Sequence, residues 1–244
     1  MNKKLIAASL LAAAPMAAQA DILGAHAGAY VWQQKWSGDV RANGDTLDVE
    51  KDLGYDDDSG SSFYVALEHP IIFIPELRLQ RTELEISERN DFQRQVNFAG
   101  ATFNVNDTVD STTDLGHTDA TFYYEILDNW LNLDVGLTAR IFDGEVRLKT
   151  NTDQGQIDVD PVIPMAYVQA RFDLPLTGLY GSVLGNVLSI DDNSVTDTTI
   201  NLGYEVGVLG FELGYRNFDV DLEDNDERAK VNVDGYFLGV VIDI

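Results

Sequence analysis

The chain has 244 residues, with 41 Asp and Glu against 16 Lys and Arg, three His, no Cys and a formal charge of −25. The absence of cysteine excludes disulfide scaffolds, thiol nucleophiles, Cys-ligated zinc and iron–sulfur clusters. The acidity argues against nucleic-acid binding, which needs a Lys/Arg surface. The length allows one large domain or two small ones.

The first twenty residues have the pattern of a secretory signal peptide. Lys3 and Lys4 form a positive start, Leu5–Ala14 is apolar, and Ala18–Ala20 reads Ala-Gln-Ala. The apolar run is well short of the ~20 residues of a membrane-spanning helix. We therefore expect residues 1–20 to be removed on export, which leaves 14 basic and 41 acidic residues, a charge of −27, on a single domain of residues 21–244.

The mature chain alternates apolar and polar residues with a period of two. Between Leu131 and Ile141, for example, six apolar residues alternate with Asn, Asp, Gly, Thr and Arg. Such alternation indicates strands with one apolar face. About ten strands are predicted, at 22–35, 62–68, 77–87, 117–127, 130–149, 161–174, 178–190, 197–208, 210–222 and 231–244. The third changes its pattern near Leu84. The fifth changes at Asp143-Gly144, where a bulge or turn is expected.

Long and short connections alternate along the chain. Segments 36–61 and 88–116 are long and 150–160, 191–196 and 223–230 are medium, whereas those between them, such as Asp128-Asn129, are short. Outer-membrane barrels have an even strand number, short periplasmic turns and longer outer loops. The sequence therefore predicts an all-β fold, a closed antiparallel up-and-down transmembrane β-barrel of ten strands, with eight as the alternative, in the outer membrane.

A soluble, lipocalin-like barrel alternates in the same way, with its apolar face inside. Two features favour the membrane barrel. The polar face carries both signs of charge, which can pair across a lumen, and aromatic residues lie near strand ends, as interfacial girdles require. The aromatic residues are Tyr30, Trp32, Phe63, Phe122, Tyr124, Trp130, Tyr204, Phe211, Tyr215 and Tyr236.

Several short motifs resemble a poorly characterised family of small proteobacterial outer-membrane β-barrel proteins and, more distantly, OmpW-like barrels. They are Asp52-Leu53-Gly54, Glu68-His69-Pro70, Ile74-Pro75, Leu77–Gln80, Asp119–Glu125 and the strand that begins at Trp130. The resemblance implies an outer-membrane location and insertion by the barrel-insertion machinery, without implying an activity. The chain departs from the usual aromatic C-terminal residue by ending in Ile244.

The histidines are the natural candidates for catalysis, because enzymes on such barrels need a base beside a nucleophile or water. His26 is expected in the lumen, His69 in a periplasmic turn, and His117 at the outer rim. His117 beside Asp119 or Ser111 is the basis of one alternative function, a surface lipid-modifying hydrolase. A lone histidine is a weak signal, so no catalytic or cofactor-binding residue is assigned.

Acidic residues cluster in the expected outer loops, at Asp56–Asp58, Asp191–Asn193 and Asp221–Glu227. Oxygen-rich clusters suit Ca²⁺ or Mg²⁺, but none follows a known metal-binding motif. Solvated loop acids are the first interpretation. Loosely bound divalent cations, shared with lipopolysaccharide at the cell surface, are the second.

Charged residues of both signs on the inward face are expected to form a lumen network. Its members are Asp119, Glu125, Asp134, Arg140, Arg171, Glu205, Glu212 and Arg216. Ion pairs among them would close a lumen that side chains nearly fill in a barrel of this size. The sequence thus predicts a non-catalytic structural barrel or narrow pore. A passive channel for small hydrophobic or ionic solutes is the alternative.

Overall fold

The computed structural model describes residues 24–191, 193–224 and 226–244, which form seventeen strands and no helix. The predicted signal peptide, residues 1–20, lies outside these residues. Among the described residues, no helix is long and apolar enough to cross a membrane.

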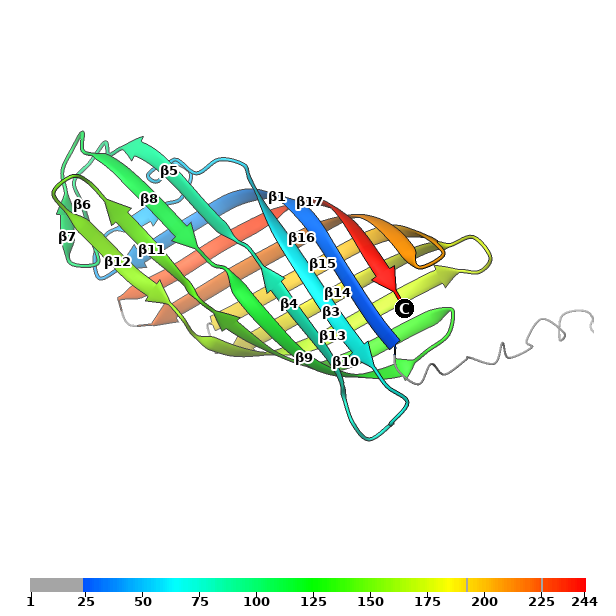
Figure 1. Ribbon diagram of the computed structural model, residues 1–244. Helices are drawn as coiled ribbons and strands as arrows, with labels where there is room; N and C mark the ends of the chain where they lie inside the picture. Colours follow the sequence, from blue (N-terminus) through cyan, green and yellow to red (C-terminus); the bar gives the residue numbers. More distant parts are fainter. Residues whose placement is uncertain (1–23, 192, 225) are drawn as a thin grey trace, which may run out of the picture.

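Ten of the described strands form one closed antiparallel barrel (Figure 1). They are β1 (Gly24–Ala42), β3 (Asp58–Glu68), β4 (Glu76–Thr82), β9 (His117–Leu127), β10 (Leu131–Phe142), β13 (Val162–Leu174), β14 (Leu179–Ile190), β15 (Asn193–Val206), β16 (Leu209–Asp224) and β17 (Glu227–Asp243). Each strand pairs with the next in the chain, and β17 pairs with β1, with Ala29 opposite Val240. The predicted fold class and strand number are confirmed.

A second sheet continues one wall of the barrel beyond its outer end. It consists of β5 (Glu85–Asp91), β8 (Thr108–Asp114), β11 (Gly144–Lys149) and β12 (Gln154–Val159). These strands prolong β4, β9, β10 and β13, and they pair in the same order (Figure 1). Short strands β2 (Thr46–Asp48), β6 (Val96–Phe98) and β7 (Ala101–Phe103) complete this part, which we call the outer extension.

The outer extension corrects the prediction of long loops. Segments 36–61, 88–116 and 150–160 contain the end of β1, the start of β3, and strands β2, β5–β8 and β12. The expected bulge or turn at Asp143-Gly144 also does not explain the change of pattern there. Although Asp143 interrupts the strand, Arg140 and Phe142 before it and Val146 and Leu148 after it are all buried, so the even-numbered residues face inward throughout.

What changes at the joint between the two parts is the polarity of the interior. In β4 and β10 the inward residues are polar, as at Thr82 and Arg140, whereas the inward residues beyond the joint are apolar, as at Leu84 and Leu148. The outer faces change in the opposite sense: Leu79 and Leu137 are exposed on the barrel, and Glu85 is exposed on the extension. The extension is therefore built as a water-soluble β-structure, and the barrel as a membrane-embedded one.

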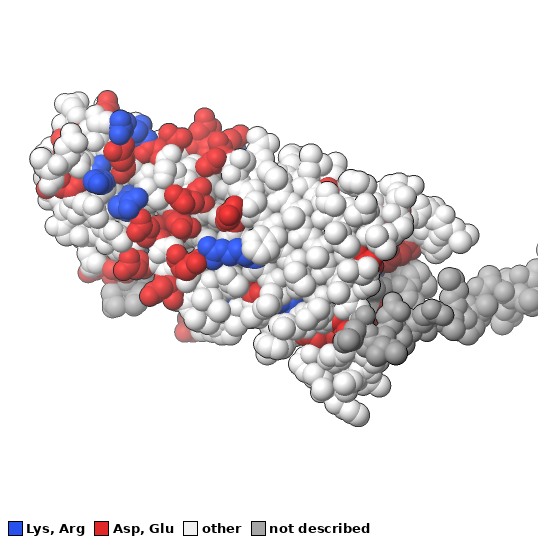
Figure 2. All heavy atoms as spheres, viewed as in Figure 1, with Lys and Arg blue, Asp and Glu red and all other residues white. Residues whose placement is uncertain are grey.

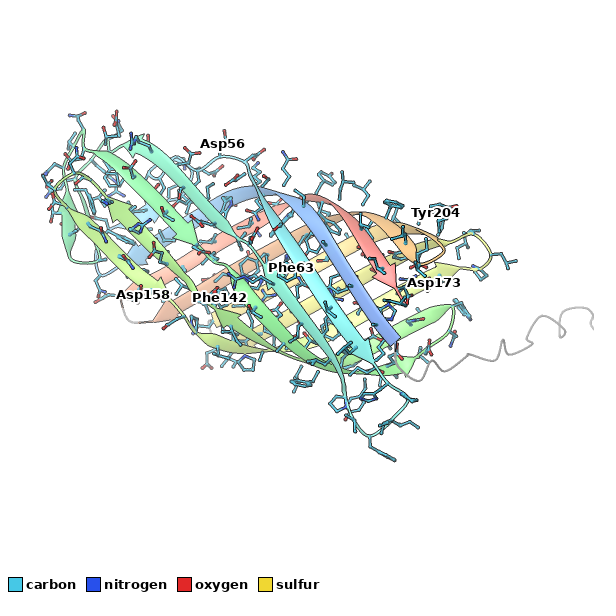
Figure 3. The ribbon with its side chains drawn as sticks, viewed as in Figure 1. Asp56, Phe63, Phe142, Asp158, Asp173 and Tyr204 are labelled. Atoms are coloured by element: carbon cyan, nitrogen blue, oxygen red, sulfur yellow. The ribbon has the colours of Figure 1, made fainter. Side chains whose placement is uncertain are left out.

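The surface shows the same division. Lys, Arg, Asp and Glu gather over the extension, while the barrel is almost free of them on the visible face (Figure 2). Phe63 and Tyr204 are about half-exposed on the barrel, and Asp56 and Asp158 are exposed on the extension (Figure 3). Tyr30 and Trp32, expected in the aromatic girdles, instead point inward and are buried. The apolar exterior marks the segment that lies in lipid. The end with the short turns and both described chain ends is the periplasmic one.

Candidate functional site

Polar side chains line the lumen in the membrane section, in two neighbouring compartments. The larger, of about 420 Å³, lies at the periplasmic end beside Gly24 and Ile244, and we call it the vestibule. A smaller cavity of about 80 Å³ lies deeper and ends at Asp197 and Arg216. Tyr64, Arg78, Gln169 and Arg171 line both compartments and separate them.

Four buried charged residues form a layer across the lumen above the smaller cavity. The Arg140 guanidinium donates two hydrogen bonds to Asp119, at 2.8 and 2.7 Å, and one to Asp197 at 2.6 Å. Arg216 donates two to Asp197, at 2.8 and 2.6 Å. All four are less than 5% exposed: Arg140 0%, Arg216 1%, Asp197 2% and Asp119 4%. We call Asp119, Arg140, Asp197 and Arg216 the charged layer.

Neighbouring groups satisfy Arg216 further. It donates to the Tyr30 hydroxyl at 2.9 Å and to Thr82 Oγ1 at 3.3 Å, and its guanidinium lies 4.8 Å from the centre of the Trp32 ring. Arg140 lies 5.2 Å from the ring centre of Phe218. Charges buried in this way are tolerated because each has an opposite partner with several hydrogen bonds.

Directly above the charged layer, the interior is a packed apolar core. Trp36, Leu47, Phe98 and Phe218 are each at most 1% exposed within it. It fills the space between the second sheet and the outer ends of β1, β15, β16 and β17. Moving outward, the interior is thus occupied first by the ion pairs and then by the hydrophobic packing.

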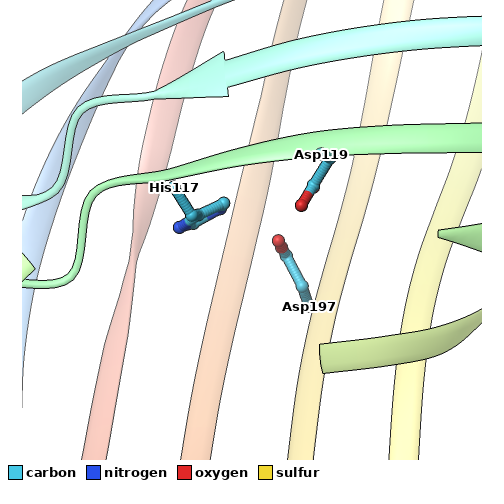
Figure 4. Close-up of side chains that lie close together, drawn as sticks. All are labelled: His117, Asp119 and Asp197. Atoms are coloured by element: carbon cyan, nitrogen blue, oxygen red, sulfur yellow. The ribbon is translucent and has the colours of Figure 1, made fainter. Parts of the chain in front are cut away.

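His117 lies at the junction of the charged layer and this core. It is fully buried, its Nδ1 lies 2.9 Å from the Leu115 carbonyl oxygen, and its ring packs against Phe142 and Phe218. His117 points toward Asp119 and Asp197 (Figure 4), and one ligand atom from each of the three lies within 4.8 Å of the others. Both carboxylates already accept hydrogen bonds from arginines, whose positive charge opposes a metal ion.

This placement differs from the expectation that His117 lies at the outer rim. Its side chain is closed off from the surface, and the Ser111 hydroxyl donates to the carbonyls of Leu53 and Glu88. His69 lies in the β3–β4 turn, where its Nδ1 accepts the backbone N–H of Ile71 at 3.3 Å. His26 lies in the vestibule beside Glu68.

The eight predicted lumen residues fall into three separate groups. Asp119, Arg140 and Arg216 belong to the charged layer. A second group lies on the wall of the lumen, where Arg171 pairs with Glu205 at 2.7 Å and Glu212 accepts hydrogen bonds from Tyr180 and Asn201. Glu125 and Asp134 lie in the vestibule with no arginine hydrogen-bonded to either.

Three residues of the site were missing from the predicted network. Asp197, the bridge between both arginines, shares the parity of Thr199, Asn201 and Glu205 at the start of a predicted strand, so alternation alone could have identified it. Glu68 and Glu76 flank the β3–β4 turn and project into the vestibule. Glu68 has the inward parity of its predicted strand but was left out of the network, and Glu76 precedes the predicted strand 77–87 with the parity of Arg78.

No protein-family model and no curated protein matches the chain. Solved structures with a similar arrangement include the COG4313 outer membrane channel from Pseudomonas putida F1, with 13% identity over 95% of this chain and 99% of that chain, at a TM-score of 0.40. A FadL homologue from Pseudomonas aeruginosa has 9% identity over 90% of both chains, at a TM-score of 0.33. The P. putida toluene transporter TodX has 9% identity over 91% of this chain and 90% of that chain, at 0.30.

The location of the protein follows from its own architecture. A closed barrel with an even number of strands, an apolar exterior and short turns at one end is the architecture of outer-membrane proteins. The predicted outer-membrane location is therefore supported. Membership of the family suggested by the Glu-His-Pro and Asp-Leu-Gly motifs stays a prediction.

Proposed function

We propose that the protein is a structural outer-membrane barrel with a sealed lumen, non-catalytic and non-conducting at rest, that carries the β-rich outer extension at the cell surface. One observation carries this proposal. The charged layer crosses the lumen with every member less than 5% exposed, and the apolar core lies directly above it. An ion that entered from the periplasm would have to break the buried ion pairs and then cross the core.

A passage for small hydrophobic molecules has less support. The apolar cavity described in the outer part, lined by Val40, Phe142 and Val220, measures about 60 Å³. An apolar cavity that holds benzene in another protein is about 150 Å³. The core would therefore have to repack to admit such a solute.

Planar-bilayer recording tests the sealed lumen. Purified protein is reconstituted over a range of salt concentrations, and its folded state is checked by heat-modifiable migration of protein recovered from the same vesicles. We expect no current above the lipid baseline. Protein-dependent current steps in the resting wild type would refute the structural proposal.

A gated narrow channel is the second candidate. It is favoured by the two neighbouring polar compartments, the first at the periplasmic end and the second ending at Asp197 and Arg216. Asp197→Asn loosens the charged layer while preserving side-chain size. If Asp197→Asn shows channel current in planar bilayers while the wild type shows none, the gated channel is favoured. If neither protein shows current, the permanently closed barrel is favoured.

The third hypothesis, a surface hydrolase based on His117, gains no support from the position of that residue. Its test is the lipid A profile of a deletion strain, which we expect to be unchanged. The proposed partners are outer-membrane lipid, lipopolysaccharide and the barrel-insertion machinery. Loosely bound Ca²⁺ or Mg²⁺ at exposed acids such as Asp56 and Asp57 would bridge the extension to lipopolysaccharide phosphates.

A further inference from the structure

The vestibule contains more negative charge than its own cations neutralise. Glu68, Glu76, Glu125, Asp128, Asp134, Asp173 and Asp243 line it, together with His26, His69, Arg78 and Arg171. Arg171 is engaged by Asp173 and Glu205, and Arg78 donates to Gln80 and stacks on Tyr64. Near β3, β4 and β9, His26 lies 2.8 Å from Glu68 and 3.3 Å from Asp243, and the Tyr123 hydroxyl donates to Glu68 at 3.2 Å.

Three of these acids converge from three neighbouring strands. Glu68 ends β3, Glu76 begins β4, and Glu125 lies near the end of β9. One carboxylate oxygen from each lies within 4.8 Å of the others. Oxygens bound to one Ca²⁺, each about 2.3–2.6 Å from the ion, have separations in this range.

Unsatisfied buried oxygens at the same place provide a second, independent observation. Glu76 and Asp134 are each 7% exposed, and each has a buried oxygen, Oε2 and Oδ1 respectively, with no hydrogen-bond partner among the described residues. Both residues line the vestibule. A buried carboxylate oxygen without a partner is costly, and a cation is the partner that satisfies several such oxygens together.

We propose that Glu68, Glu76 and Glu125 bind one divalent cation in the vestibule, with Ca²⁺ preferred to Mg²⁺, and that Asp134 completes its negative surroundings. The donors are all oxygens, which favours a hard cation. They come from three strands of an irregular cavity, and Ca²⁺ tolerates such geometry better than Mg²⁺, which demands a near-ideal octahedron.

The bound ion would act as a structural link at the periplasmic rim. It would join β3 to β4 across the turn of residues 69–75, and both strands to β9, while it removes the repulsion among the three glutamates. Because the ion would bind the folded barrel and not the unfolded chain, it should raise the unfolding temperature. The expected rise in unfolding temperature does not depend on conduction. The proposed cation site and the proposed sealed lumen can therefore be refuted independently of each other.

Calorimetric titration of CaCl₂ into the full barrel, in detergent after EDTA dialysis, tests the proposal. We expect one saturable site per chain and a Ca²⁺-dependent rise in the temperature of heat modification. The double variant Glu76→Gln/Glu125→Gln should lose at least tenfold in Ca²⁺ affinity and lose the temperature rise. MgCl₂ should bind more weakly than CaCl₂ to the wild type.

The matched control is Glu85→Gln/Asp158→Asn, which removes two exposed charges from the outer extension and should keep the site. If the double glutamine variant does not fold, the single variant Glu125→Gln, at a less buried position, takes its place. The absence of saturable Ca²⁺ binding in the wild type would overturn the proposal and indicate that protons neutralise the cluster. Equal binding by the wild type and the glutamine variants would overturn it too.

Discussion

Asp197 is the residue on which the charged layer depends most. Its carboxylate accepts hydrogen bonds from both Arg140 and Arg216, whereas Asp119 accepts from Arg140 alone. Removing one partner from a buried pair leaves a charge that neither water nor protein compensates. The two arginines thus make the lumen seal sensitive to this single carboxylate.

We therefore predict that Asp197→Ala destabilises the folded barrel by about 3–5 kcal/mol, the cost of breaking a buried ion pair. The free energy of unfolding in urea, followed by the loss of heat-modifiable migration, measures this cost. The control is Glu223→Gln, which removes the partner of Arg41 in an ion pair at 3.1 Å on the extension. Glu223 is about half-exposed, so its loss should cost about 0–1 kcal/mol. Equal costs for both variants would contradict the account.

Tyr55 gives the extension a defined response to alkaline pH. Its hydroxyl lies 2.8 Å from that of Thr113, and burial raises the pKa of Tyr55 from 10 to about 12. Because the folded pKa is the higher one, the stabilisation by Tyr55 is complete below pH 10 and is lost as pH rises toward 12. The wild type should therefore lose its advantage over Tyr55→Phe in unfolding temperature across this interval. A difference that stays constant from pH 9 to 12 would show that Tyr55 does not titrate as described.

For single residues, the alternation of apolar and polar residues predicts which face of the strand a side chain lies on better than it predicts which residue that side chain pairs with. The inward parity assigned to His26 applies equally to Tyr30 and Trp32, which were placed in the aromatic girdles because of their residue type. Arg171 was expected to belong to the same network as Arg140, but it pairs with Glu205 on another part of the wall. Distances across a lumen depend on barrel closure and strand stagger, which one strand's sequence does not contain.

At the scale of the elements, the four joints between barrel and extension explain the observed sequence pattern. Side chains keep their alternation across each joint, while the medium inside changes from a polar lumen to an apolar core. Leu84 and Val146 are therefore apolar on the face that is polar in the membrane. The same alternation of side chains therefore continues from strands whose outer face meets lipid, in the barrel, to strands whose outer face meets water, in the extension.

The core of the extension should unfold without the barrel. Leu148, on β11, is 0% exposed, and its replacement by Ala should cost about 2–5 kcal/mol. Because this core is confined to the outer end, Leu148→Ala should increase trypsin cleavage at Arg89, Arg94, Arg147 and Lys149 while heat-modifiable migration persists. The exposed control, Asp158→Ala on the neighbouring strand β12, should stay resistant to trypsin. Simultaneous loss of both properties in Leu148→Ala would mean that the two parts unfold together.

The ten barrel strands were predictable because nearly all of them have a lipid-facing apolar side and are long enough to cross the membrane; β4, with seven residues, is the shortest. Of the extension strands, β11 and the start of β5 fall within the predicted segments 130–149 and 77–87, whereas the others were missed because several are short or polar. Residues Thr108–Asp114, for instance, contain one apolar residue, Val109, yet they pair with both β5 and β11. Their stability depends on partners distant in sequence, so the same residues appear as a loop when each segment is considered alone.

For the whole molecule, the acidity of the chain has a clear location. Charged side chains crowd the extension and leave the barrel exterior nearly free of them on the visible face (Figure 2). The remaining charge lies in the lumen, paired at the charged layer and mostly acidic in the vestibule. Net charge thus reports on the surfaces that meet water, whereas the apolar barrel exterior determines where the molecule resides.

The position of the membrane gives the last prediction. Leu137, near the middle of β10, is 67% exposed on the barrel exterior. A lipid-facing arginine at the bilayer midplane costs about 2–4 kcal/mol. We expect Leu137→Arg to lower the folded fraction in lipid vesicles by this free energy, measured from urea titrations of the folded and unfolded bands. Gln156→Arg, on the exposed face of β12 in the extension, adds the same charge in water and should have little effect. Because both substitutions add one arginine to an exposed strand face, one in lipid and one in water, equal stabilities would place lipid somewhere other than around the barrel section.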